Sequence, residues 1–339
     1  MATNNFKAFG IGAGANVTSQ ADYEALAALL TGFQSGKASS AQINKALRQS
    51  STMAYVLAQF ISDSASVDVL DNGGLAAILA NLKNSVQNIA KNTAIPIMTG
   101  IVGQSRNARM SVTTASAIAD FLADELVVNT AIGGNQYRLK NVGSRITLTA
   151  TGVGGMDTGS PPATGFVAIY VIYNPANGSV GLLGVDATSS VAPEVYGGSN
   201  MPSGYTASAL VAVWPTASSQ LVIGNMYDRK IDLASRTLLT SSSTNASRVS
   251  LATTQFPLNA KFIYGGLSMT NSSSSTQGLT IWGANSSIGG MAITASLAAS
   301  ASASSTFSKI SVVNQTIGWS STSTAGTPTY NIGINSYEF

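Results

Sequence analysis

The sequence predicts an α+β protein organised by segment, with a small α-helical N-terminal segment followed by mainly antiparallel β-sandwich-type domains. Up to about residue 100, apolar residues recur at helical spacings of three and four. From Met110 onward, short β-branched and aromatic runs alternate with Gly, Pro and Asn turns, which is typical of strands. After Arg236 the charge almost disappears, which indicates a further domain. The predicted segments are residues 1–100, 101–230 and 231–339.

Three helices are predicted in the first segment. The first follows an N-cap at Ser19 and covers 23–30, with Gly32 as its stop. The second begins at Ser39 or Ser40 and runs to about Ser62, and the third spans about 75–91. The two longer helices carry stripes of residues at alternating spacings of three and four. These stripes are Leu47, Ser50, Ala54, Leu57 and Ile61, then Leu75, Ile78, Leu82, Ser85 and Ile89.

Such stripes are compatible with two kinds of packing. In one, each helix packs inside a single small bundle. In the other, the stripe forms a parallel seam between identical chains, as in a trimeric stalk. The sequence leaves both open, and the helices are too short for a long coiled coil.

In the second segment the strongest strand signal is the run 166–173, which is apolar throughout and therefore typical of a strand buried on both faces. Asn177-Gly178 is a hairpin signal that joins this run to a strand at 180–185. The next run, 209–214, is expected to stop at Pro215, because proline donates no ladder hydrogen bond. Further strands are predicted at 124–128, 145–150 and 220–224.

The C-terminal segment combines strand signals with very few charges. Beyond residue 236 its charged residues are Arg248, Lys261, Lys309 and Glu338. Strands are predicted at 261–264, 278–283, 290–296, 307–313, 316–320 and 329–335. Between residues 295 and 306 every residue except Leu297 is Ala, Ser or Thr. That tract is either a flexible loop or a strand in a place where large side chains do not fit.

Composition excludes several classes of function. The chain has 339 residues, no Cys and no His, and only 9% of its residues are charged. It therefore lacks disulfides, thiolate nucleophiles, histidine-based triads and zinc sites built on thiolate or imidazole. The net charge of +3 is scattered and forms no basic stripe for nucleic acid. No calcium-loop spacing occurs. We expect no cofactor, no metal and no nucleic-acid partner.

The low charge does not indicate a membrane protein. The apolar run at 166–173 is far shorter than the roughly twenty residues of a spanning helix. The first residues contain no apolar signal-peptide core, so we expect a soluble protein that is not exported by that route and is not inserted in a membrane.

Catalysis would have to rest on carboxylates or on a serine–lysine pair. The acidic residues of the β region are Asp120, Asp124, Glu125, Asp157, Asp186, Glu194, Asp228, Asp232 and Glu338. Their spacing pairs none of them for acid–base work on a glycan. Asp228 and Asp232 flank two basic residues, which indicates a solvated turn or an ion pair between chains. The Gly-rich runs at 9–14 and 152–155 lack the context of a phosphate cradle. We expect no catalytic residues.

Aromatic side chains are better candidates for recognition. The segment 193–205 lies between two strand signals and is long for a loop in a compact domain, and such loops are often functional. Its Tyr196 and Tyr205 either stack on a sugar or cover the edge of the sandwich. Trp282 and Trp319 lie beside Gly, Asn and Ser in the charge-poor segment, where they either contact polyols or belong to the core. These four residues are the predicted receptor-binding candidates.

Several stretches resemble bacteriophage tail fibre proteins. In the first segment they are GAGANV (12–17), DYEAL (22–26), GFQSG (32–36), LAQF (57–60) and DVLD (68–71). In the second they are AIGGNQYR (131–138), GGMDTG (154–159), PEVYGG (193–198) and NMPSGYTASA (200–209). The resemblance covers roughly residues 5–230, and the remaining residues resemble tail fibre proteins only in their general character.

This resemblance implies a homotrimer that is part of the virion tail and is assembled in the host cytoplasm. Its N-terminal segment would dock to a tail, baseplate or adaptor protein. Its distal β domains would bind a host surface glycan or an outer-membrane receptor without catalysis. The alternatives are a glycan-degrading tailspike, whose usual β-helix repeats are not visible here, and a purely structural tail component. Because no repeat array is present, the fibre would be short or a compact tip.

Overall fold

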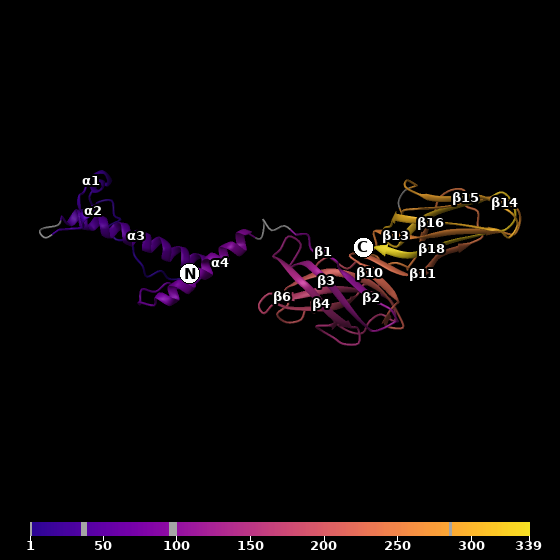
Figure 1. Cartoon of the computed structure of the whole chain (residues 1–339), viewed down its shortest axis with the longest axis horizontal. Coiled ribbons are helices and arrows are strands. Elements are labelled where there is room, and N and C mark those ends of the chain that lie inside the picture. The colour runs from indigo at the N-terminus through magenta and orange to yellow at the C-terminus, as the bar shows by residue number, and fades with distance from the viewer. Residues whose placement is uncertain (1, 35–38, 95–99, 285–286) are drawn as a thin grey trace. The chain divides into compact units, whose positions relative to one another are not determined.

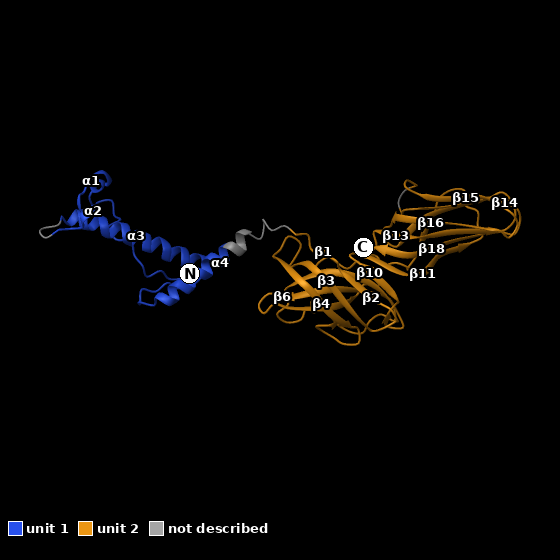
Figure 2. Ribbon diagram, viewed as in Figure 1, with its two compact units in different colours: residues 1–99 blue, residues 100–339 orange. Residues whose placement is uncertain are grey.

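The computed structural model describes residues 2–34, 39–94, 100–284 and 287–339, and for 90–94 it describes the backbone alone. The chain divides into two compact units, Met1–Thr99 and Gly100–Phe339 (Figure 2). Unit 1 holds helices and unit 2 holds strands, so the prediction of β-rich structure after residue 100 is confirmed. Among the described helices, none is long and apolar enough to span a membrane.

The described part of unit 1 contains helices α1 (Gln20–Glu24), α2 (Ala28–Thr31), α3 (Ser40–Ala65) and α4 (Leu75–Ala94) (Figure 1). The Ser19 side chain accepts a hydrogen bond from the Asp22 N–H at 3.2 Å, so the predicted first cap is confirmed. The single helix expected over 23–30 is instead two short ones, because i→i+3 hydrogen bonds around Leu26 interrupt the helical pattern. Gly32, with φ +70°, ends α2, and Ser39 precedes α3, both as predicted.

Helices α3 and α4 pack against each other around a very small core (Figure 1). Its buried apolar side chains are Ala58, Ile61 and Val69. Ser85 of α4 is also buried, and its hydroxyl donates to the Ile61 carbonyl across the helix pair at 3.2 Å. The Asn5 N–H donates to the Val69 carbonyl at 3.0 Å, which fastens the N-terminal segment to the same core.

The described part of unit 2 contains strands β1 to β18, which pair antiparallel except for the short parallel pair β5 and β7. Its first half contains β1 (Ser105–Arg106), β2 (Arg109–Val112), β3 (Ile118–Asn129), β4 (Gln136–Thr147), β5 (Gly155–Met156), β6 (Thr164–Asn174), β7 (Ser179–Asp186), β8 (Ala207–Ala217), β9 (Gln220–Leu221) and β10 (Gly224–Tyr227). Its second half contains β11 (Lys230–Ser241), β12 (Val249–Ala252), β13 (Phe262–Asn271), β14 (Ser275–Trp282), β15 (Met291–Leu297), β16 (Ser302–Ser311), β17 (Thr316–Ser323) and β18 (Pro328–Glu338).

The strands form two sheets. The larger has the order β16-β13-β18-β11-β10-β2-β3-β8-β6-β7-β5, with β1 and β4 also paired to β3 and β9 to β8. The smaller has the order β12-β17-β14-β15. Inward residues of the smaller sheet, such as Leu279 and Ile317, join one buried cluster with Met269 and Ile332 of the larger sheet. The second half of unit 2 is therefore built from two sheets with a shared apolar core.

Strand β6 confirms the strongest strand prediction, since residues 166–172 are all buried. Gly178, with φ +77°, lies in the predicted turn between β6 and β7. The prediction that the next strand stops at Pro215 is wrong, because β8 continues to Ala217. The Val222 N–H donates to the Pro215 carbonyl at 3.1 Å, so the polar backbone groups of Pro215 face away from β6. The missing N–H therefore costs the β6–β8 ladder nothing.

The larger sheet continues across residue 230. Tyr227 of β10 pairs with Lys230 of β11, and Asp228 (φ +50°) lies in the tight turn between them. The Tyr337 hydroxyl on β18 is buried and donates to the Val213 carbonyl on β8 at 2.5 Å. Strands from both halves therefore share hydrogen bonds and core, and the division into domains near residue 230 stays a prediction.

The six strands predicted in the C-terminal segment correspond to β13 through β18. Residues 302–306 of the Ala, Ser and Thr tract belong to β16, so that part of the tract is a strand and not a loop. Strands β11 and β12 had not been predicted.

Candidate functional site

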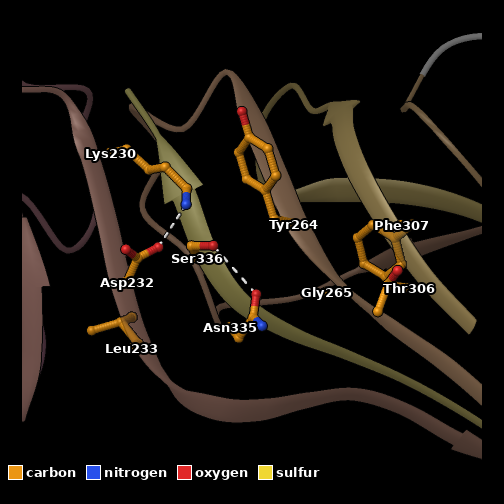
Figure 3. A pocket seen from close by; sticks show the side chains of 9 residues that line it. All are labelled: Lys230, Asp232, Leu233, Tyr264, Gly265, Thr306, Phe307, Asn335 and Ser336. Carbon is orange, nitrogen blue, oxygen red and sulfur yellow. Dashed lines mark hydrogen bonds and ion pairs between the residues drawn. The ribbon is translucent and has the colours of Figure 1, made fainter. Parts of the chain in front are cut away.

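A hollow lies on strands β11, β18, β13 and β16, where these neighbouring strands lose register. Tyr264 pairs with Ser336 while Gly265 pairs with Ile334, so Asn335 is the extra residue of a β-bulge. The β11–β18 and β13–β16 pairs shift register at the same level of the sheet. Bulges bend strands and redirect side chains, and they are common beside functional sites. Here the bulge brings both Asn335 and Ser336 to the surface of the hollow (Figure 3).

Glycine is required at the centre of this bulge. A Cβ atom added to Gly265 would lie 1.9 Å from the Gly333 carbonyl oxygen. The backbones of β13 and β18 approach each other too closely here for any other residue, and the floor of the hollow depends on that approach.

The hollow has a volume of about 330 Å³. Its lining combines two aromatic rings, the partly exposed Tyr264 and the buried Phe307, with charged, amide and hydroxyl groups. The lining residues are Lys230, Asp232, Leu233, Tyr264, Gly265, Thr306, Phe307, Asn335 and Ser336. Figure 3 shows Lys230 and Asp232 on the β11 side and Thr306 and Phe307 on the β16 side, with Tyr264 at the rim. Thr306 and Asn335 are exposed, so their polar groups are available to a ligand.

The charges of the hollow interact with one another. The Lys230 ammonium lies 2.8 Å from Asp232 Oδ1 and 5.1 Å from the centroid of the Tyr264 ring. The Tyr264 hydroxyl donates to Glu338 Oε1 at 2.8 Å. Loss of hydration, together with this hydrogen bond and the carboxylate's charge, raises the pKa of Tyr264 to about 12. The phenol therefore stays protonated at neutral pH, and its ring is held in place by contacts on two sides.

The same arrangement continues beside the hollow. Phe262 lies two residues before Tyr264 on β13, so both side chains project from the same face of the strand. The Lys309 ammonium lies 5.0 Å from the centroid of the Phe262 ring. Lys309 itself has φ +55° where β16 loses register with β13. Two aromatic rings, each with a lysine against it, thus lie side by side on this part of the sheet.

The chemistry of the hollow is that of recognition by hydrogen bonding and stacking. It presents a carboxylate, an amide and hydroxyls around an aromatic ring, and one of its two nearby carboxylates is paired with lysine. Among the described residues no group of three or more acidic side chains could hold a metal ion.

Two of the four predicted aromatic candidates are buried. Tyr196 is 9% exposed, and its hydroxyl donates to Asp157 Oδ2 at 2.9 Å and accepts from the Asn200 N–H at 3.1 Å. Burial raises the pKa of Tyr196, and its ring meets the Tyr170 ring edge-on with centroids 5.7 Å apart. Trp319 is 5% exposed and belongs to the core cluster. Little of either ring is available to a receptor in the single chain.

The other two candidates are partly exposed but lie outside the hollow. Tyr205 packs against the core cluster. The Trp282 indole lies against Gly290, where an added Cβ would meet the ring at 2.2 Å. Tyr264 was not among the predicted candidates, although the period-two pair Phe262 and Tyr264 in a charge-poor strand next to Lys261 was a usable signal.

The loop containing residues 193–205 is fastened to the rest of unit 2. Glu194 forms a two-fold ion pair with Arg229, with N–O distances of 2.8 and 3.0 Å. The Arg229 Nε donates to the main-chain oxygen of Phe339 at 2.7 Å, and the guanidinium lies over that residue's ring. Lys261 lies 4.0 Å from the same glutamate. In the single chain these charges join the two halves of unit 2.

A second, apolar groove lies on α3 of unit 1. It has a volume of about 390 Å³ and is lined by Phe9, Leu47, Ser50, Ser51 and Ala54. The Phe9 N–H donates to Ser51 Oγ at 2.9 Å, which holds the N-terminal segment along the helix. The groove coincides with the predicted α3 stripe, of which only Ile61 is fully buried.

Comparisons with known proteins assign the chain to no family. No family model matches the chain, and no curated protein matches it. Three solved structures show weak likeness. A Bacillus thuringiensis Cry1Da tryptic core variant is 10% identical over 74% of this chain and 54% of that chain, with a TM-score of 0.19. The insecticidal crystal protein Cry2Aa is 13% identical over 74% of this chain and 53% of that chain (TM-score 0.19), and infectious bursal disease virus Gx strain is 12% identical over 70% of this chain and 68% of that chain (TM-score 0.18). The chain spans about half the length of the two crystal proteins. At these TM-scores the likenesses indicate neither the fold nor the function of this chain.

Proposed function

We propose that the protein is a bacteriophage tail fibre, a structural virion protein that attaches the particle to a host cell-surface receptor without catalysis. The receptor is a surface polysaccharide in this proposal. The virion assignment rests on the sequence resemblance of residues 5–230. The receptor-binding role rests on one structural observation, the hollow around Tyr264, whose aromatic, amide and hydroxyl groups suit a polyhydroxylated ligand.

Unit 1 supports a docking role in the same proposal. Among the described residues, its core contains three buried apolar side chains, whereas Leu47 and Leu57 on the α3 stripe are each 48% exposed. Exposed apolar stripes of this kind are covered by partners. In the proposed assembly three identical chains and a tail, baseplate or adaptor protein cover unit 1. Nucleic acid and membrane insertion play no part.

An adsorption assay tests the proposal. Purified full-length protein is added to host cells before phage, and the fraction of unadsorbed phage is measured. We expect the protein to block adsorption in a saturable way while releasing no oligosaccharide from host polysaccharide. Steady release of oligosaccharide would establish the depolymerase alternative, and no effect on adsorption together with no binding to cells would establish a purely structural component.

A further inference from the structure

The hollow around Tyr264 has the properties of a subsite for one uncharged sugar residue. We propose that it binds a neutral pyranose unit of a surface polysaccharide and discriminates against uronic acids and other acidic sugars. This inference rests on the proposed attachment function and adds the class of sugar and the residues that select it.

The charges in and beside the hollow disfavour acidic sugars. The cation lining the hollow, Lys230, already contacts Asp232 at 2.8 Å and lies against the Tyr264 ring. Glu338 adds a second carboxylate, held by the Tyr264 hydroxyl at 2.8 Å. A ligand carboxylate would thus meet the Asp232 carboxylate, would have to compete with it for the ammonium, and would also be repelled by Glu338 behind the Tyr264 hydroxyl. Like charges brought together at a binding site suppress the wrong partner.

The other polar and aromatic groups of the hollow suit a neutral sugar. Asp232 has a second carboxylate oxygen that can accept from a sugar hydroxyl, and the exposed Asn335 and Thr306 offer donors and acceptors from the neighbouring strands. Tyr264 supplies a rigid aromatic face whose position is set by its contacts with Lys230 and Glu338. A volume of about 330 Å³ is at the small end of ligand pockets, which suits a single sugar unit of a longer chain.

A binding titration tests the inference with the full-length chain. The probes are methyl glucoside, galactoside and mannoside, each compared with its matching acid (methyl glucuronide, galacturonide and mannuronide), using saturation-transfer NMR and calorimetry. We expect at least one neutral sugar to bind, and the matching acid to bind at least about tenfold more weakly, because a difference of roughly 1.4 kcal/mol corresponds to tenfold. Equal or tighter binding of the acid would overturn the inference, and so would no binding of any neutral sugar.

Three variants separate the hollow from the rest of the surface. Tyr264→Ala removes the ring and should weaken neutral-sugar binding about tenfold. Tyr264→Phe keeps the ring, so it should bind within about threefold of wild type, and melting curves of both variants show whether a loss in the alanine variant comes from misfolding. Asn331→Ala is the matched control, because Asn331 lies four residues before Asn335 on β18 and accepts from Thr240 instead of lining the hollow.

The adsorption assay keeps the two proposals distinguishable. If the wild-type chain blocks adsorption and folded Tyr264→Ala blocks it equally well, the attachment function stands and the neutral-sugar subsite is refuted. If the chain binds the neutral sugar but never blocks adsorption, the subsite stands and the attachment function is refuted.

Discussion

The exposed stripe on α3 allows a quantitative prediction about assembly. Leu57→Ala removes a side chain that is 48% exposed in the single chain. Full burial of a leucine contributes roughly 1.5–3 kcal/mol, so burying its exposed half against other copies contributes about 1 kcal/mol per chain. A symmetric trimer contains three such contacts, and the variant should therefore lose about 3 kcal/mol of association free energy. That loss corresponds to roughly a hundredfold lower association constant.

Sedimentation equilibrium over a dilution series measures this loss directly. The matched control is Val56→Ala, because Val56 is 53% exposed on the same helix but lies about 100° around it from Leu57. We expect the control to associate like wild type. Far-UV circular dichroism of both variants should show that α3 is retained, since alanine favours helix.

Two results would refute the reasoning. A wild-type chain that stays monomeric at all concentrations would show that the stripe does not join copies of this chain. Equal weakening by Leu57→Ala and Val56→Ala would show that association does not use the stripe face.

Three further predictions concern unit 2. Tyr337→Phe leaves the buried Val213 carbonyl without its 2.5 Å hydrogen bond and should lower the free energy of unfolding in urea by about 1–3 kcal/mol; an unchanged midpoint would contradict this. Gly265→Ala should lower the melting temperature strongly, because its Cβ would lie 1.9 Å from the Gly333 oxygen, whereas a wild-type melting curve would show that the strands separate easily. The pKa of Tyr264 is raised to about 12 from an unfolded value near 10, so its contribution to stability is present below pH 10 and is lost as the pH rises to about 12. Melting temperatures from pH 8 to 12 should therefore fall less steeply in Tyr264→Phe, and parallel curves would argue against the shift.

The elements predicted correctly are those whose signals are local. The Ser19 cap, the buried strand β6 and the Gly178 turn each depend on residues adjacent in sequence. Pro215 was predicted wrongly because its effect depends on which neighbour its backbone faces, and that is fixed by pairing with Val222. Local patterns do not contain that information.

The shape of the candidate site could not be predicted for the same reason, although the period-two pair Phe262 and Tyr264 was a local signal for its aromatic strand. The hollow exists because Gly265 and Asn335, far apart in sequence, meet at a bulge. Nor does sequence show which aromatic residue is exposed. Tyr196 is buried because its hydroxyl meets Asp157, 39 residues away, whereas Tyr264 lies at a rim made by four strands.

The scarcity of charge connects the two proposed roles. Beyond residue 236, Lys261 approaches Glu194, Lys309 lies over an aromatic ring and Glu338 accepts from Tyr264. In the proposed subsite, recognition through the hollow therefore relies on hydrogen bonds to an uncharged ligand and on stacking, which act at short range and are weak at each site. Joining copies raises the effective concentration of the remaining sites once one is bound, so overall binding can exceed that of a single site by orders of magnitude. A weak subsite for a neutral sugar in unit 2 thus fits the proposed assembly in which unit 1 holds several copies together, and the exposed stripe containing Leu57 is the surface that we propose for that contact.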